Sequence, residues 1–187
     1  IADMTIDDGH VDVDFSRSSA QLPRPLNCVL SNAIAPALVA LRCMLDADVP
    51  MNGGLQRALS VTCKEGLILT PVLPAPVGAR AMVATLAYDC VLECLGQAAP
   101  QGGCASSSGG TTMPFVWTAD AIPGREARIL VDNSLTGGTG GRGDADGMDA
   151  VDNSVTNAMN YPVEMLEQEY AVIVERHELR ADSGGPG

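Results

Sequence analysis

Two stretches with apolar residues at helical spacing limit the fold more than any other feature of the sequence. The first begins at Asn32, and its apolar residues share one helical face: Ile34, Leu38, Leu41 and Leu45. Asn32 is a candidate N-cap, and Pro36 would then fall in the first turn, where proline costs little. The second stretch predicts a helix over residues 77–97, with these side chains facing inward: Ala81, Leu86, Cys90 and Cys94.

Short β-like runs surround the two helical patterns. Residues 10–16 alternate apolar and polar side chains, and residues 55–71 predict two short strands around a turn at 64–66. Residues 114–118, 127–133 and 171–180 are further predicted strands, and residues 160–170 predict a short helix. Helices and strands are mixed without a strict βαβα alternation, so we expect an α+β fold.

Charge and hydropathy exclude two classes of function. The net charge is −12, and the chain has only 11 Lys and Arg residues, which are scattered. A nucleic-acid surface needs clustered basic residues, so we exclude nucleic acid as the main partner. No apolar run approaches the roughly 20 residues that a membrane helix needs, so no membrane partner is expected either.

Six cysteines are spread over residues 28–104, and the two histidines are His10 and His177. This spacing offers no local cluster of metal ligands and no dense disulfide framework. We therefore expect reduced, mostly buried thiols and a cytoplasmic protein.

Three polar motifs have both a chemical and a structural interpretation. Glycines at 137–143 could approach a phosphate, but no Gly-Lys-Ser/Thr follows, which favours a solvated loop. The acidic run 144–152 is similar to the start of a calcium loop and lacks its closing Glu. Residues 105–110, ASSSGG, could hold a nucleophilic serine, although the absence of a neighbouring histidine favours a loop.

Several long stretches together resemble one family. They cover residues 25–54, 74–80, 95–109 and 156–187, the last containing TN, NYPVE and DSGG in order. They resemble the B-type subunit of the hydantoinase B/oxoprolinase family, and the similarity extends over nearly all 187 residues. We therefore expect residues 1–187 to be a central to C-terminal segment of a larger subunit, with a soft boundary at 101–112.

The resemblance implies ATP-driven attack on an unreactive carbonyl. An A-type partner subunit would bind ATP and Mg²⁺ and phosphorylate the carbonyl oxygen, and the B-type subunit would complete the reaction. The first hypothesis is an amidohydrolase that acts on a cyclic amide such as a hydantoin, a lactam or oxoproline. The alternatives are a ketone carboxylase of the acetone or acetophenone type, and a non-catalytic scaffold subunit.

The resemblance also implies a divalent-metal site with His and Asp ligands in an N-terminal region that these residues do not include. No metal ligand is therefore assigned to this chain. Relatives often carry histidine in the acidic loop where Asp149 and Asp152 stand here. This departure puts proton transfer by a histidine of that loop in doubt.

The shared motifs also give the candidate site residues. Arg80 and Glu164 are the candidate catalytic residues, and the candidate substrate-binding residues are Asn52, Gly53, Gly54, Thr156 and Asn157. The guanidinium of Arg80 suits a phosphate or carboxylate, and glycines at 53–54 permit positive φ angles. Structural alternatives remain open: a salt bridge for Arg80, a helix cap for Glu164, and turn formation for the two asparagines.

Overall fold

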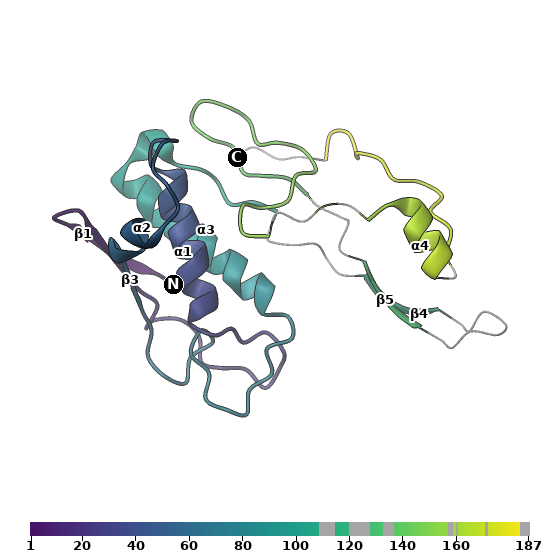
Figure 1. The fold of residues 1–187 in the computed structure, drawn as a ribbon, viewed down its shortest axis with the longest axis horizontal. Helices are drawn as coiled ribbons and strands as arrows, with labels where there is room; N and C mark the ends of the chain where they lie inside the picture. The colour runs from purple at the N-terminus through teal and green to yellow at the C-terminus, as the bar shows by residue number, and fades with distance from the viewer. Residues whose placement is uncertain are drawn as a thin grey trace.

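The computed structural model of the protein describes residues 1–108, 115–119, 128–132, 137–156, 159, 161–170 and 172–183. Within these residues the chain forms helices together with two small sheets, which confirms the α+β fold class. Figure 1 places the first sheet with helices α1 and α3 on one side, and β4, β5 and α4 away from them. The predicted boundary at 101–112 falls between these two parts and stays a prediction.

The first sheet has the strand order β1-β2-β3. Strands β1 (Asp3–Asp7) and β2 (His10–Asp14) are antiparallel, and Asp8 and Gly9 form their turn with positive φ angles. Strand β3 (Leu59–Thr62) pairs in parallel with β2. The alternation that predicted β2 corresponds to the burial of Val11 and Val13. Strand β1 was not predicted, because its side chains are mostly exposed and carry little apolar pattern.

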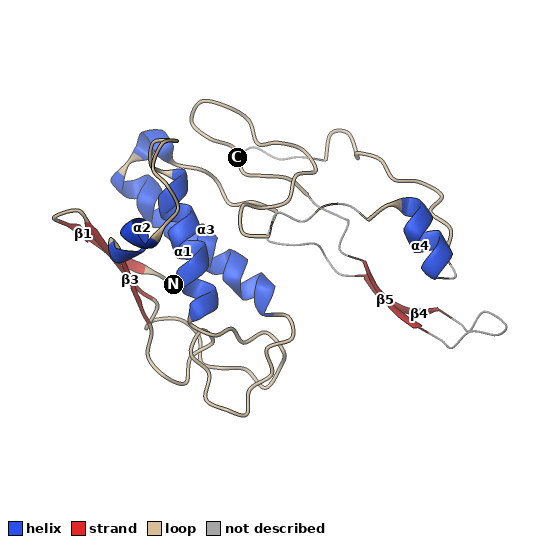
Figure 2. Ribbon diagram, viewed as in Figure 1, coloured by secondary structure: helices blue, strands red, loops and turns tan. Residues whose placement is uncertain are grey.

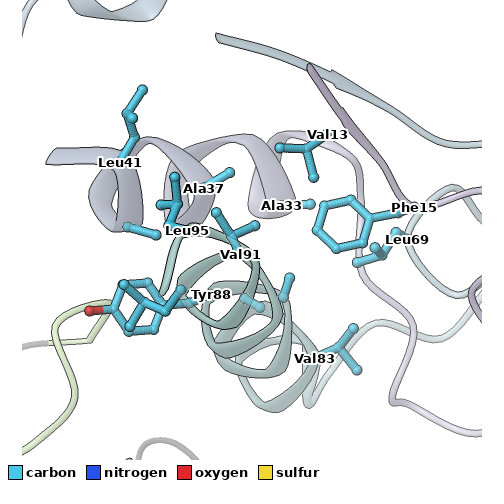
Figure 3. Packing of buried hydrophobic residues seen from close by; sticks show 14 of the residues in the cluster. Val13, Phe15, Ala33, Ala37, Leu41, Leu69, Val83, Tyr88, Val91 and Leu95 are labelled. Atoms are coloured by element: carbon cyan, nitrogen blue, oxygen red, sulfur yellow. The ribbon is translucent and has the colours of Figure 1, made fainter. Parts of the chain in front are cut away.

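Helices α1 (Ser31–Cys43) and α3 (Arg80–Ala98) pack against each other and form the core with one face of the sheet. Small side chains on α1, among them Ala33 and Ala37, are fully buried. Figure 3 shows Ala37 beside Val91 and Leu95 of α3, and Ala33 beside Phe15 at the end of the sheet. Alanines allow the two helix backbones to approach closely, which explains a core with few aromatic residues.

The predicted helical faces were partly wrong. The buried face of α1 is Ala33, Pro36, Ala37, Ala40 and Leu41, and Leu45 is exposed beyond the helix end. The N-cap is Leu30 rather than Asn32, and Pro36 lies inside the helix beyond its first turn. On α3 the prediction for Leu86 fails, since its side chain is 56% exposed. The prediction placed mainly large apolar side chains in the core. In the structure, close packing of the two helices buries small side chains instead.

The segment between the long helices also differs from the prediction. Residues 55–57 belong to a short helix, α2 (Gly53–Arg57), and only β3 forms a strand in 55–71. Leu67 makes isolated bridges to Ala20 and Thr70 instead of a second strand. The 3-10 helix η1 (Pro100–Gly102) follows α3.

The second half of the described chain contains the antiparallel pair β4 (Phe115–Ala119) and β5 (Arg128–Asp132). Helix α4 (Val163–Glu169) follows (Figure 2), and these three elements confirm their predictions. The strand predicted at 171–180 is wrong, because the described residues of that stretch are irregular. No helix in the described part of the chain has the length and hydropathy needed to span a membrane.

The cysteines are free thiols, and their burial was overestimated from the sequence. Cys28 alone is buried, Cys43 is exposed, and the remaining four are partly buried. Desolvation raises the pKa of the Cys28 thiol, although the charge of Arg80 opposes this shift.

Candidate functional site: a pocket of serines and glycines

Two runs that the sequence indicates as loops lie side by side after helix α3. The backbone amide of Ala105 donates to the carbonyl of Gly141 at 2.8 Å, and that of Ser108 donates to Gly138 at 3.1 Å. Cys104 adds a β-bridge to Arg142. These bonds join the serine segment 105–108 to the glycine segment 137–141, which are 30 residues apart in the sequence.

A third segment closes the other side of the glycine run. The amide of Thr139 donates to the carbonyl of Met148 at 3.0 Å, and the amide of Met148 donates back to the Thr139 hydroxyl at 2.8 Å. Residues 146–149 are thereby held against residues 137–140, and they bring the carboxylates of Asp146 and Asp149 to the same place.

Two glycines are required by the close approach of these segments. A Cβ atom at Gly140 would lie 1.8 Å from the carbonyl oxygen of Ala105, and one at Gly147 would lie 2.0 Å from that of Thr139. Both contacts are with backbone atoms, which cannot rotate away as a side chain could. The glycines therefore serve backbone packing around a hollow, which a solvated loop would not need.

The three segments enclose a pocket with a volume of about 590 Å³. We call it the serine–glycine pocket, and its lining comprises residues 105–108, 137–141, 146–149 and Ser183. The wall offers hydroxyls, backbone amides and carbonyls together with a similar share of apolar surface. Its volume falls in the range of roughly 300–1,000 Å³ that is typical of small-molecule sites.

A buried carboxyl group lies behind the serine wall. Asp89 of α3 is only 9% exposed, and its Oδ1 atom has no hydrogen-bond partner among the described residues. Desolvation raises the pKa of Asp89, and a hydrogen bond from the backbone amide of Ser107 partly opposes the shift. The hydroxyl of Ser107 is likewise buried without a partner in the described part of the chain. Buried polar atoms of this kind are rare and are a recognised feature of functional sites.

A turn at residues 152–156 is linked to the same helix. The buried Asn153 accepts hydrogen bonds from the amides of Val155 (2.9 Å) and Thr156 (3.2 Å). Ser154 hydrogen-bonds to Tyr88, whose hydroxyl oxygen points away from the other labelled core residues in Figure 3. Burial raises the pKa of the Tyr88 phenol, and the hydrogen bond with Ser154 partly opposes the shift.

Asn52 is found in a helix-capping position. Its side-chain oxygen accepts from the amides of Gly54 (2.8 Å) and Leu55 (3.3 Å), which makes it the N-cap of α2. Gly53 and Gly54 are helical and do not use the positive φ angles that glycine permits. These contacts give Asn52 a structural role at the start of α2. A substrate-binding role for Asn52, Gly53 and Gly54 stays a prediction.

The remaining candidate residues are dispersed. Arg80 is the exposed first residue of α3, and Glu164 is exposed in the first turn of α4. Figure 1 shows α4 well away from α3. The Thr156 hydroxyl donates to Asp152 at 2.6 Å. Asn157 lies outside the described residues. Arg80, Glu164 and Asn52 are therefore not brought together within this segment, and their catalytic or binding roles remain predictions.

The residues present do not fit a metal ion. Within the described part of the chain, no group of three or more His, Cys, Asp and Glu side chains is arranged to hold one. We therefore derive no metal-dependent step from this segment.

The pocket residues were missed because their signal was assigned to loops. The serines 106–108 and Ser183 stand in stretches that carry the family resemblance. The available signal for a pocket was the run of small residues at 105–110 together with the glycine run at 137–143. The sequence alone could not show that the runs meet.

In the known proteins that this chain matches, the corresponding region is part of a longer chain. The sequence profile of the family described as hydantoinase B/oxoprolinase matches residues 2–187, and the chain belongs to this family. An uncharacterized protein of Methanocaldococcus jannaschii is 33% identical over 183 residues, which cover 97% of this chain and 31% of that protein. The beta subunit of caprolactamase from Pseudomonas jessenii is 28% identical, again with 97% and 31% covered. The chain thus spans about a third of the length of these relatives.

Two solved structures have a similar fold. The crystal structure of the ATP-dependent caprolactamase from Pseudomonas jessenii matches with a TM-score of 0.85 and 26% identity, covering 100% of this chain and 33% of that one. Nucleotide-free acetone carboxylase matches with a TM-score of 0.74 and 15% identity, covering 89% of this chain and 23% of that one. The second likeness shows the fold alone.

Proposed function

We propose that this chain is part of a subunit of an ATP-dependent amidohydrolase that opens a cyclic amide of the hydantoin, lactam or oxoproline type. The observation that supports this most is the match to the ATP-dependent caprolactamase, which covers 100% of the chain at a TM-score of 0.85. The family description, hydantoinase B/oxoprolinase, names two further reactions on cyclic amides.

The proposed chemistry overcomes the resonance of the amide bond. Transfer of the γ-phosphoryl group of ATP to the carbonyl oxygen removes this resonance and makes the carbon electrophilic. Water then adds to the carbon, the ring C–N bond breaks, and the nitrogen leaves as an amine. A second water hydrolyses the resulting acyl phosphate, so that one ATP yields ADP and phosphate for each ring opened.

We propose that ATP and Mg²⁺ are bound by an A-type partner subunit. The related caprolactamase chain is named as a beta subunit, which supports a heteromeric complex. The 11 Lys and Arg residues of this chain are scattered in the sequence, whereas a triphosphate site would need several of them together. The cytoplasm, which supplies ATP, is the proposed compartment.

The same experiment decides between this proposal and its alternatives. The full-length subunit, purified with its partner, is supplied with ATP and either hydantoin, 5-oxoproline or caprolactam, or with acetone and bicarbonate. We expect ADP release together with a ring-opened product that is heavier by one water. Carboxylation of acetone without amide hydrolysis would replace the proposal by a ketone carboxylase. Full turnover by the partner subunit alone would indicate a scaffold.

A further inference from the structure

We propose that the serine–glycine pocket binds an uncharged cyclic amide of the lactam or hydantoin type, and not the oxoproline type, which carries a carboxylate. This inference rests on the proposed function and names the part of the chain that holds the substrate. Nothing in the names of the related proteins assigns a ligand to residues 105–108, 137–141 and 146–149. The inference depends on the charge, the hydrogen-bonding groups and the volume of this pocket.

The charges at the pocket disfavour an anion. Asp146 and Asp149 are part of its lining, and no Lys or Arg belongs to that lining. The nearest basic group in sequence, Arg142, forms an ion pair with Asp144 at 3.4 Å. A phosphate among the glycine amides would therefore face two carboxylates without a compensating cation. An uncharged ligand avoids this repulsion.

The groups in the wall match the edge of a cyclic amide. In a small ring the amide is held cis, so its N–H and its C=O present a donor and an acceptor side by side. Serine hydroxyls can both donate and accept, and the surrounding backbone adds donors and acceptors. A polar wall of this kind can bind the amide edge, and the open volume of about 590 Å³ accommodates the ring.

Ser107 and Asp89 anchor the wall of the pocket. The hydroxyl of Ser107 is buried, and its backbone amide donates to Asp89, so the buried carboxyl fixes this point of the wall from behind. The neighbouring Ser108 lines the pocket with an exposed side chain. We assign Ser108 as a substrate-binding residue, and Ser107 and Asp89 as positioning residues.

Direct binding tests the inference without turnover. The full-length subunit, without ATP, is titrated with caprolactam in a calorimeter or by ligand-observed NMR. We expect Ser108→Ala to weaken binding about tenfold, the equivalent of about 1.4 kcal/mol. Ser106→Leu, which fills the pocket from an exposed position, should abolish it. Ser31→Ala, at the exposed start of α1, is the matched control and should bind as the wild type does.

A second ligand tests the amide edge. N-methylcaprolactam lacks the ring N–H and should bind at least tenfold more weakly to the wild type, with a smaller difference in Ser108→Ala. Unchanged affinity in both pocket variants would overturn the inference. So would saturable binding of inorganic phosphate or Ca²⁺ at this pocket in place of the lactam.

The outcomes for the pocket and for the proposed function can be separated. If the complex hydrolyses caprolactam and both pocket variants keep the wild-type KM, the pocket assignment is wrong and the function stands. If the lactam binds the pocket as predicted but no amide is hydrolysed, the pocket assignment stands and the proposed reaction is wrong.

Discussion

The amide of Ala105 donates to the carbonyl of Gly141 across 2.8 Å, and this bond joins two loops that neither helix nor sheet holds in place. The neighbouring Gly140 lies so close to Ala105 that no side chain fits between them. The pocket therefore depends on backbone contact between two short segments.

Replacing Gly140 by alanine should disrupt the serine–glycine pocket. The added Cβ would meet the Ala105 oxygen at 1.8 Å, so the two segments must separate. We expect a loss of about 1–3 kcal/mol in the free energy of unfolding, measured by chemical denaturation of the full-length subunit. Gly143→Ala is the matched control, since nothing lies within 4 Å of its added Cβ, and it should change stability by less than about 0.5 kcal/mol. Equal losses in the two variants would contradict the close packing.

Asp89→Asn should stabilise the subunit at neutral pH. Burial raises the pKa of Asp89, so the folded state favours its neutral form. The contribution of this group to stability is therefore complete below its ordinary pKa of 3.8 and is lost as the pH rises through the folded value. Asparagine keeps an acceptor for the Ser107 amide and carries no charge. We expect a higher melting temperature at pH 7, with the gain shrinking toward pH 4. A gain that grows on acidification would contradict the raised pKa.

Asn52→Ala should weaken helix α2 locally. It removes the acceptor of the Gly54 and Leu55 amides, a loss of about 1 kcal/mol for a typical N-cap. Hydrogen exchange at these two amides should become faster, and Asn52→Asp, which keeps the acceptor, should restore protection. If Asn52→Asp keeps the cap and still loses turnover, Asn52 also binds a ligand.

Arg80→Ala tests a catalytic role that the structure of this segment leaves open. Arg80 is exposed at the start of α3, so its removal should change the free energy of unfolding by less than about 0.5 kcal/mol. If the guanidinium binds a phosphate or carboxylate in the complex, turnover should fall at least tenfold. The exposed Arg24 provides the control substitution to alanine. Equal, small effects of the two variants on turnover would leave Arg80 without a catalytic role.

Asn27→Ala should be among the most destabilising changes in the first half of the chain. The Asn27 side chain is fully buried and bonds both the amide (2.8 Å) and the carbonyl (2.7 Å) of Leu22, and the carbonyl of Pro76 (2.9 Å). Leaving these backbone groups unpaired should cost about 2–4 kcal/mol. Gln21→Ala also removes a pair of bonds to Val72, but at an exposed site, and should cost about 1 kcal/mol or less. Denaturation midpoints of the two variants check this order.

The elements that the sequence predicted best are those with a strong local pattern. The alternation in β2, the apolar runs of β4 and β5, and the Pro162–Val163 start of α4 are readable because neighbouring residues determine them. The two long helices were recognised for the same reason. Their buried faces were not, because the fit of Ala37 depends on Val91 and Leu95 of α3, which are more than 50 residues away in the sequence.

The sequence by itself determined the family, the α+β class and the absence of a clustered basic surface. These properties are carried by composition, local periodicity and motif order. Only the tertiary structure decided that residues 105–108, 137–141 and 146–149 form one pocket with Asp89 behind it. Serine and glycine runs predict little about tertiary structure, since such residues occur in solvated loops as well as in the wall of a pocket. Their arrangement is set by backbone hydrogen bonds and by close approach between distant segments, and these interactions are specified by the folded chain as a whole.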